Sequence, residues 1–546
     1  MKTETRAAEP SAEPAPLGTT DIREIELKFL LDEAAFKAAQ RSDLLGGNQR
    51  RAVRRLQSVY FDTAEGHLRR NRTVLRMRTY RGAHVMTLKD VGTDPTNPFI
   101  RAQIEVKSPT SEPDLALLDP AVAAEIRRAT DDRPLVARFS TDIRRSVQRI
   151  TSNRSEIEVA FDTGTIIAGT QRETVREIEL ELKSGDVADL FTLGLALSET
   201  VPARLGILSK SERGWLLSTG GAIRAARADS PIQPHHSVDD VFATVIGTCI
   251  RQFTANWPAF ERAEGPGDEK AGGKEPVHQM RVAMRRLRAA LGLFQRGFPC
   301  RDFVSMRDDA KRIASAMGDA RNWDVFADLV HDGPGKNFST ESGFAPLLAA
   351  SGKFRAAGHA TVDALLQSRD TTRFVLSALT FVSRRGWRNE MLGADLPMLS
   401  APAAGFAASC LARLDKQVRK RGRHIVDLPP DSRHEVRIAL KKLRYATDFF
   451  APLFPDSQAV RTYARATARL QDVLGRFNDM AMAIDLVNRL PLDNDAAASR
   501  AAGIVLGWYG RDAAITTDDL QETWRRFRKA KPFWTDALDQ ETMEAG

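Results

Sequence analysis

Hydrophobic and polar residues alternate with a period of two in the first part of the chain, and with a period near 3.6 in the rest. The first pattern is typical of half-buried strands and the second of amphipathic helices. Between residues 21 and 216 the alternation predicts antiparallel strands at 22–30, 55–61, 73–79, 84–89, 99–107, 143–150, 156–161 and 176–183. Helices at 32–41 and 186–200 are expected to flank this sheet.

The second pattern predicts an all-helical region at 237–530, after a linker at 217–236 that contains Gly, Pro and Ser. Its helices are expected at 238–258, 275–297, 301–316, 343–368, 400–423, 431–453, 457–476 and 495–520. The polar segments at the two ends predict a disordered tail at 1–20 and a polar C-terminal tail at 531–546.

The helical region contains an internal repeat. The segment HQMRVAMRRLRAALGLF (278–294) matches HEVRIALKKLRYATDFF (434–450), with identical or chemically similar residues at the basic and apolar positions. A shorter motif follows each copy, GDARNWD at 318–324 and GRFND at 475–479. The repeat predicts two related helical bundles, at about 237–385 and 400–530.

Charged residues occupy alternate positions of several predicted strands. In IREIELKFL (22–30), Glu24, Glu26 and Lys28 share one face, because residues two apart in a strand point to the same side. Alternation alone is also what a solvated sheet face shows. However, the Glu-x-Glu rows at 156–162 and 177–183 are on different strands from most of the basic residues. This separation indicates a polar tunnel with divalent cations on one wall and phosphate on the other.

Eight short blocks in this half resemble, in order, the CYTH domain of the triphosphate tunnel metalloenzymes. They are EIELK (24–28), YFDT (60–63), LRMR (75–78), TLK (87–89), TDIRR (141–145), IEVAFDTG (157–164), EIELELKSG (177–185) and SKSERG (209–214). The resemblance covers residues 21–216 and implies an eight-stranded antiparallel tunnel that uses Mg²⁺ or Mn²⁺. Members of the family hydrolyse inorganic or thiamine triphosphate, cap RNA or cyclise ATP.

The resemblance also implies roles for individual residues. The metal-binding carboxylates would be Glu24, Glu26, Asp162, Glu179 and Glu181, with Glu158 and Glu177 as further candidates. The triphosphate would contact Lys28, Arg76, Arg78, Lys89, Arg145 and Lys210. The candidate catalytic residues are Glu24, Glu26, Lys28 and Lys89. Gln103 departs from the family pattern, in which a carboxylate often stands. The implied chemistry is metal-assisted phosphoryl transfer to water.

Basic residues form a stripe on one helix of each repeat. At 100° per residue, His278, Arg281, Arg285 and Arg288 fall within about 80° of one another. The second copy places His434, Arg437, Lys441 and Arg444 in the same way. A solvated basic face is the simpler interpretation. Like charges three or four residues apart nevertheless destabilise a helix by a few tenths of a kcal/mol per pair, so we favour a bound polyanion.

The repeat resembles the CHAD domain over about residues 235–530. The resemblance implies two four-helix bundles around a basic pore that bind long-chain inorganic polyphosphate through the eight residues of the two stripes. Arg286 and Lys442 are further candidates for this contact. Arg321 and Arg476 would either join them or pair with Asp324 and Asp479.

Composition is consistent with these interpretations. The net charge of +9 favours a polyanionic partner. Three widely spaced cysteines argue against a disulfide framework and fit a reducing cytoplasm. No apolar run approaches the roughly 18–20 residues that span a membrane. The aromatic motifs expected of a single-strand nucleic-acid binder are missing, so we expect neither a membrane nor a nucleic acid as partner.

The sequence therefore predicts a cytoplasmic, metal-dependent hydrolase of inorganic triphosphate, fused to a polyphosphate-binding domain that associates with polyphosphate granules. This order of domains resembles that of bacterial inorganic triphosphatases. One alternative is a thiamine triphosphatase or adenylate cyclase on the same scaffold, but no motif indicates a pocket for the organic group. Another is a non-enzymatic polyphosphate-binding protein with a silent tunnel, against which the intact carboxylate pairs argue.

Overall fold

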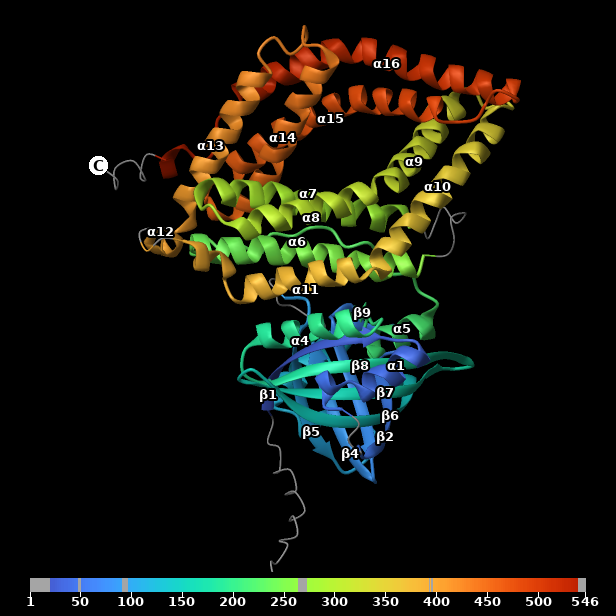
Figure 1. The fold of residues 1–546 in the computed structure, drawn as a ribbon, viewed down its shortest axis with the longest axis vertical. Helices are drawn as coiled ribbons and strands as arrows, with labels where there is room; N and C mark the ends of the chain where they lie inside the picture. Colours follow the sequence, from blue (N-terminus) through green and yellow to red (C-terminus); the bar gives the residue numbers. More distant parts are fainter. Residues whose placement is uncertain are drawn as a thin grey trace, which may run out of the picture.

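The computed structural model describes residues 20–47, 51–90, 97–263, 273–391, 393 and 396–538. A β domain lies at one end of the molecule and an all-helical domain at the other (Figure 1). The tail predicted at 1–20 lies outside the described residues except for Thr20, which begins the first strand. The predicted fold class, an antiparallel β tunnel followed by an all-α domain, is confirmed.

The β domain is a closed barrel. Within the described chain, eight antiparallel strands pair in the order β5-β4-β3-β2-β6-β7-β8-β1, and β1 pairs again with β5 to close the sheet. These strands are β1 (Thr20–Leu30), β2 (Val53–Asp62), β3 (Thr73–Tyr80), β4 (Ala83–Asp90), β5 (Ile100–Ser108), β6 (Val136–Ser152), β7 (Ser155–Ala168) and β8 (Gln171–Ser184). A short strand, β9 (Arg204–Gly206), also pairs with β1.

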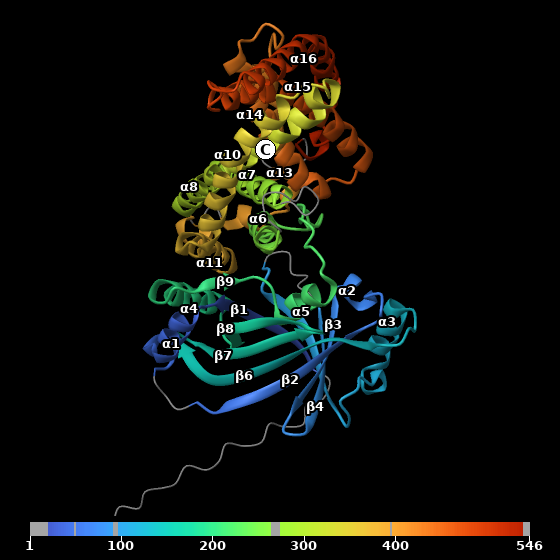
Figure 2. The same ribbon diagram turned by 90° about the vertical axis from the view of Figure 1, so that its right-hand side faces the viewer.

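The alternation along β1 sorts its side chains between the two faces of the barrel. Leu27 and Phe29 are fully buried on the outside, in an apolar cluster with residues of two covering helices. These helices are α1 (Glu33–Arg41) and α4 (Val187–Thr200), and α2 (His67–Arg70) and α3 (Pro120–Thr130) cover another part of the barrel. The intervening Glu24, Glu26 and Lys28 face the interior. The helix α5 (Lys210–Thr219) lies at the end of the barrel that faces the helical domain (Figure 2).

The helical domain consists of two bundles in contact. The helices are α6 (Val238–Glu261), α7 (Lys274–Gly297), α8 (Arg301–Ala316), α9 (Gly318–Val330), α10 (Phe344–Gln367), α11 (Arg369–Ser383), α12 (Leu396–Ser400), α13 (Ala403–Arg421), α14 (Pro430–Phe450), α15 (Ser457–Asn488) and α16 (Ala496–Lys529). Figure 1 shows α6, α7, α8 and α11 side by side, with α9 and α10 extending toward α15 and α16. There Trp323 and Phe326 share a separate apolar core with Leu486 and Val505.

Some helices differ from the prediction. The segments of α9 and α11 were not expected to form separate helices, and α15 and α16 continue beyond the predicted ends at 476 and 520. The extension of α15 passes through Gly475, because an isolated glycine weakens a helix without necessarily ending it. Of the tail predicted at 531–546, only residues 531–538 are described, and there Trp534 is buried against Tyr463 with ring centroids 4.9 Å apart.

Helix α4 lies between the barrel and the helical domain. A Cβ atom at Gly194 would be 2.8 Å from Leu27 Cδ1 of the barrel and 3.4 Å from Leu376 Cδ1 of α11. The Arg384 guanidinium also donates to the Asp189 carboxylate of α4 at 2.8 Å. The two domains therefore share a packed interface rather than only a chain connection.

The connection at 220–237 has no regular secondary structure, but it is held against α6. The Asn256 side chain donates to the Ala226 carbonyl and accepts from the Ala226 amide, at 2.9 and 3.0 Å. The side chains of Cys249, Cys300 and Cys410 are buried. Among the described residues, every helix is too short or too polar to cross a membrane.

Candidate functional site

A polar chamber of about 220 Å³ lies inside the barrel. Among the described residues, seven carboxylates and eight basic side chains line it. They are Glu24, Glu26, Glu105, Glu158, Asp162, Glu179 and Glu181, with Lys28, Arg76, Arg78, Lys89, Arg101, Arg145, Lys183 and Lys210. The set contains the five predicted metal-binding carboxylates, the six predicted triphosphate contacts and the further candidate Glu158, whereas Glu177 does not line the chamber. Alternation on closed antiparallel strands brings them together, as where Lys28 lies opposite Glu179.

Three carboxylates form a buried cluster at one end of the chamber. Oxygen atoms of Asp162, Glu177 and Glu179 lie within 4.8 Å of one another. Arg145 donates from Nε and Nη2 to the two oxygens of Asp162, at 2.7 and 2.6 Å, and also donates to Glu179. Lys210 Nζ lies 2.7 Å from Asp162 and 2.9 Å from Glu179, and it also donates to Glu177. The negative charge of the cluster is thus balanced by Arg145 and Lys210.

These cations keep Asp162 and Glu179 ionised. Burial alone would raise the pKa of Glu179, but Lys210, Arg145 and Lys28 hold it well below its usual range. The same competition lowers the pKa of Asp162. Conversely, burial would lower the pKa of Lys210, and the neighbouring carboxylates raise it instead. Asp162, Glu179 and Lys210 are therefore charged at neutral pH.

A second group of carboxylates, on β1 and β8, is less well balanced. Lys89 Nζ lies 2.5 Å from Glu24, and Lys28 donates to Glu26. Glu26 lies directly opposite Glu181 in the strand register, an arrangement of like charges that destabilises the sheet. Burial raises the pKa of Glu181, and the Glu24 and Glu26 carboxylates add to this rise although Lys183 opposes it. This wall therefore carries negative charge that a bound cation would relieve.

Arginines on β3 provide the opposite kind of surface. Burial, together with Arg76 and Arg145, lowers the pKa of Arg78 to about 10. Within the described residues, Nε of Arg76 and Nε of Arg78 are buried without a hydrogen-bond partner. Arg76 Nη2 donates to Thr87 at 3.1 Å and to Glu105 at 3.4 Å. A buried donor without an acceptor is costly, so these atoms favour an anion in the chamber.

Several residues in or next to the chamber had no role predicted from the sequence. Arg101 lines the chamber and lies 3.9 Å from Glu26 and 3.6 Å from Glu212 of α5. Its position two residues before Gln103 in the alternating RAQIEVK segment was the available signal. Gln103 also lines the chamber, where its Oε1 is buried without a hydrogen-bond partner among the described residues. Arg213 donates to Glu177 of the buried cluster. Its place one helical turn after Lys210 in SKSERG was the available signal.

The N-terminus of α5 places Lys210 in the chamber. Ser209 caps this helix in a capping box with Glu212, in which each side chain bonds the other residue's backbone N–H. Lys210 is therefore the first residue of a helix whose start is well defined. Ser209 and Ser211 also line the chamber, so the first turn of α5 forms part of its wall.

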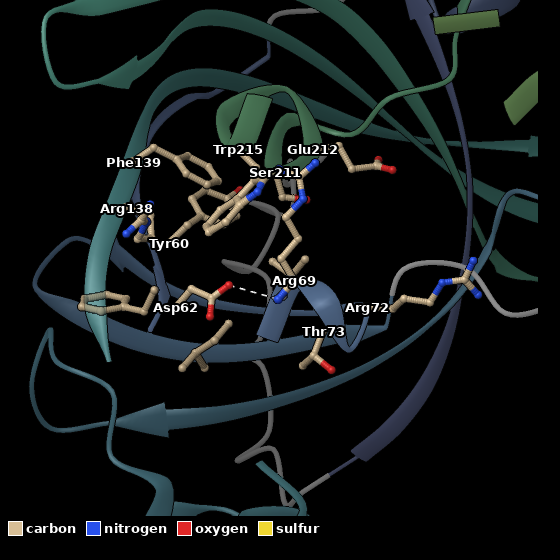
Figure 3. Close-up of a pocket in the computed structure, with 13 residues that line it drawn as sticks. Tyr60, Asp62, Arg69, Arg72, Thr73, Arg138, Phe139, Ser211, Glu212 and Trp215 are labelled. Carbon is tan, nitrogen blue, oxygen red and sulfur yellow. Dashed lines mark hydrogen bonds between the residues drawn. The ribbon is translucent and has the colours of Figure 1, made fainter. Parts of the chain in front are cut away.

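A second cavity, of about 180 Å³, adjoins the chamber at Tyr60, Val74 and Ser211 (Figure 3). Tyr60 stacks on Phe139 with ring centroids 4.5 Å apart. The guanidinium groups of Arg69 and Arg138 each lie 5.1 Å from the ring centroid of Trp215. No motif indicated this cavity, because its aromatic residues come from three separate segments.

In the helical domain, the two predicted basic stripes meet across the contact between α7 and α14. Burial, with Arg285 and Arg437, lowers the pKa of Lys441 to about 6. Burial, with Arg285 and Arg321, lowers that of Arg281 to about 10. Within the described chain, Arg281 Nη1, Arg288 Nε and Arg437 Nε are buried without hydrogen-bond partners. This region therefore carries excess positive charge, which a bound polyanion would neutralise.

The two histidines of the stripes differ in environment. His278 is half-buried, and burial together with Arg321 lowers its pKa to about 4, so it is neutral at pH 7. His434 is exposed. Arg444 is half-buried on α14. Neutral His278 keeps one N–H that can donate to an anion.

Some further candidates have other partners. The Arg286 guanidinium lies 4.6 Å from the ring centroid of Phe449 and 3.6 Å from Asp448, on the core side of α7. Asp324 accepts from Arg355 at 2.7 Å and contacts His359, whereas Arg321 lies near the His278 stripe. Arg476 donates to Asp519 at 2.9 Å and not to Asp479. Of the two alternatives left open by the sequence, the observed partners Arg355 and His359 for Asp324, and Asp519 for Arg476, do not favour pairing with Asp324 and Asp479.

Comparison with known proteins agrees with this two-part architecture. Residues 23–214 match the CYTH domain, and residues 244–488 match the CHAD domain. The chain therefore consists of a CYTH domain followed by a CHAD domain. An inorganic triphosphatase of Haemophilus influenzae is 31% identical over 217 residues, which are 36% of this chain and 56% of that protein. The match thus spans just over half the length of that relative.

Solved structures also match each part. The CHAD domain from the plant Ricinus communis is 28% identical, with a TM-score of 0.45, over 57% of this chain and 97% of that one. A Hippeastrum protein described as having a dominant triphosphatase activity is 21% identical, with a TM-score of 0.28, over 36% of this chain and 95% of that one.

Proposed function

We propose that the CYTH domain hydrolyses inorganic triphosphate with the help of a divalent metal ion, and that the CHAD domain binds long-chain inorganic polyphosphate. The observation that carries the first part is the chamber itself, in which an acidic wall and a wall of unpartnered arginine donors share one closed barrel. The related inorganic triphosphatase supports the choice of substrate.

The residues of the acidic wall fit a divalent cation. Mg²⁺ and Mn²⁺ prefer oxygen ligands. The Glu24 and Glu26 carboxylates lie close to Glu181, and Lys183 does not fully offset their repulsion. A triphosphate would also meet seven carboxylates in the described chamber. We infer that Glu24, Glu26, Glu179 and Glu181 hold the metal ion. An ion held there would neutralise phosphate charge and polarise a phosphoryl oxygen.

Asp162 has a different place in this proposal. Both of its oxygens accept from Arg145, and Lys210 lies 2.7 Å away. Both oxygens of this fully buried carboxylate already accept hydrogen bonds from one guanidinium group, which leaves little capacity for a metal ion. We therefore assign Asp162 to orienting Arg145 and Lys210, with metal binding only as a shared, lesser role.

The basic residues would bind and orient the triphosphate. Arg76 and Arg78 offer buried Nε donors, and Arg145 and Lys210 are held in place by the carboxylate cluster. Lys28 and Lys89 are paired with the metal-binding carboxylates Glu26 and Glu24, so they lie where cation and phosphate would meet. Fixed cations around the transferred phosphoryl group stabilise its developing charge, and a water attacks in line.

In the CHAD domain, the same reasoning applies to a longer anion. Arg281, Arg285, Arg437 and Lys441 approach one another, and within the described structure Arg281 Nη1 and Arg437 Nε are buried without hydrogen-bond partners. We assign polyphosphate binding to these four residues, with His278, Arg288, His434 and Arg444 extending the two stripes. Lys442 lies near Arg288 and three further arginines, at the end of the same basic surface.

The hydrolase proposal is tested by incubating the protein with tripolyphosphate and either Mg²⁺ or Mn²⁺, and measuring released phosphate. Glu26→Gln should abolish release, whereas Glu156→Gln, at an exposed position of the same barrel, should not change it. Absence of release, or equal release by wild type and Glu26→Gln, contradicts the proposal.

The aromatic cavity favours a second candidate, an organic triphosphate. Tyr60, Phe139 and Trp215 provide apolar ring surface next to the phosphate chamber, as an ester with a planar group would require. If such an ester is the substrate, ATP or thiamine triphosphate should be turned over faster than tripolyphosphate. Phe139→Ala should then reduce turnover of the ester alone. An equal loss with tripolyphosphate would reject this candidate.

A further inference from the structure

A chain of ion pairs leads from the helical domain into the chamber. Arg262 follows the last residue of α6 and donates to both oxygens of Glu173 on β8, at 2.9 and 3.1 Å. The same Glu173 accepts from Arg213 Nε at 2.7 Å. Arg213 Nη1 then donates to Glu177 at 2.9 Å, and Glu177 accepts from Lys210. The pairs are therefore continuous from α6 to the Asp162 cluster.

The two basic residues of α5 hold Glu177 from both sides. Lys210 and Arg213 are one turn apart on this helix, and they contact the two different oxygens of the fully buried Glu177. Arg213 Nη2 also donates to the Thr174 carbonyl at 2.8 Å. These contacts fix the rotation of α5 about its axis, and this rotation decides where the Lys210 ammonium group lies.

The outer end of the chain belongs to the domain boundary. Glu173, Arg213 and Arg262 line a cavity of about 530 Å³ that also includes Pro258 of α6 and Gln367 at the end of α10. Because α6 is part of the helical domain, Arg262 anchors Glu173 to that domain. Nothing in the hydrolase proposal requires this contact, since neither Arg262 nor Glu173 lines the chamber among the described residues.

We propose that Arg262, Glu173 and Arg213 are positioning residues, through which the helical domain holds Lys210 against the triphosphate. This inference rests on the proposed triphosphatase function. The Arg262–Glu173 pair is about a third exposed on the arginine side, so its effect is expected to be small. The Arg213 contacts are buried and should have the larger effect.

The test is a double-mutant cycle in the full chain, with kcat and KM for tripolyphosphate as readouts. Arg262→Gln should raise KM about threefold and Glu173→Gln about tenfold, because a displaced Lys210 binds the substrate more weakly. In a Lys210→Ala background neither substitution should have a further effect. Arg251→Gln is the matched control, since Arg251 lies on the same helix and pairs with Asp229 of the connecting segment.

Separate outcomes decide the two proposals. If Arg262→Gln and Glu173→Gln leave KM unchanged, or change it equally with and without Lys210, the positioning role is wrong. If wild type hydrolyses no triphosphate, the triphosphatase proposal fails instead. Hydrogen exchange then decides the positioning role. The amides of 209–214 should exchange faster in Arg262→Gln than in Arg251→Gln, and equal rates would reject the coupling.

Discussion

The CYTH and CHAD domains both gather basic side chains in their interiors, but they balance the charge in opposite ways. In the barrel, carboxylates lie between the cations, and they raise the pKa of Arg145 and Lys210 despite burial. In the helical domain, burial and neighbouring arginines lower the pKa of Arg281 to about 10 and that of Lys441 to about 6. Asp479, an acid whose charge acts on Arg437 and Lys441, has a raised pKa because it is buried.

This difference indicates how each region meets a phosphate chain. The barrel holds its cations in fixed positions before any ligand arrives, which is the arrangement that stabilises a transition state. The stripes of the helical domain instead repel one another until a polyanion lies between them. Binding there should therefore relieve strain, whereas binding in the barrel should exchange one set of ion pairs for another.

The largest expected effect comes from breaking the balance in the barrel. Arg145→Ala leaves Asp162 buried without its guanidinium partner, a change that costs about 3–5 kcal/mol in comparable pairs. We expect kcat/KM for tripolyphosphate to fall by about 100-fold or more and the unfolding temperature to drop. Arg149→Ala, at an exposed position of the same strand, is the control and should change neither. An unchanged unfolding temperature in Arg145→Ala would contradict the assigned pairing.

Metal binding should stabilise the barrel. At 100 times its dissociation constant, a ligand of the native state adds about 2.7 kcal/mol of stability, so excess Mg²⁺ or Mn²⁺ should raise the unfolding temperature by several degrees. A chelator should reverse the rise. The double variant Glu24→Gln, Glu26→Gln should lose it, while Glu156→Gln keeps it. Equal shifts in both variants would place the metal elsewhere.

Replacing stripe residues should have opposite effects on binding and on stability. Arg281→Met with Arg437→Met should weaken polyphosphate binding about 10- to 100-fold. The salt dependence of binding should flatten, because a protein with fewer cations displaces fewer counterions from the polyphosphate. Without polyphosphate, the unfolding temperature at low salt should rise, since mutual repulsion is reduced. Arg312→Met, on the exposed face of α8, controls for net charge. A fall in the unfolding temperature would show that the stripes are not strained.

The smallest expected effect is the uptake of a proton by Lys441 when polyphosphate binds. With a pKa of about 6, Lys441 is mostly neutral in the free protein at pH 7.5. A bound polyanion raises this pKa, so binding should take up as much as one proton, and affinity should increase as pH falls from 8 toward 6. Below pH 6 the lysine is already charged, and the increase should stop. Calorimetry in buffers of different ionisation enthalpy measures the uptake. Lys441→Met should lose it and Lys416→Met should not, and equal uptake would assign the proton to another group.

Much of the fold followed from local pattern. The alternation of IREIELKFL placed Leu27 and Phe29 on the covered face of β1 and Glu24, Glu26 and Lys28 in the chamber. The apolar stripes of the repeat likewise became bundle cores, since Leu287 and Leu443 are fully buried. Element ends were less predictable, because α15 passes through Gly475 and Trp534 is buried within a segment predicted to be a tail.

The site was predictable to the extent that strand periodicity and motif order specify which side chains face inward. The contact partners of individual charged side chains were not predictable from the sequence. Arg286 carries the same kind of charge as Arg285 one position earlier, yet it stacks on Phe449 on the core side of the helix. The sequence left open whether Arg321 pairs with Asp324, and the partners that the structure gives Asp324 come from α10. Such choices depend on which helix packs nearby.

By itself, the sequence determined the two periods, the acidic and basic rows and the repeated stripes, because these depend only on spacing along one chain. Tertiary structure decided which rows meet. Closure of β1 on β5 and β8 converted alternating faces into a chamber, and the contact of α7 with α14 placed Arg285 beside Lys441. Packing of α5 and α6 on β8 connected Arg262 to Lys210. Electrostatic energies depend on distance and burial, and both are set only when segments far apart in the chain come together.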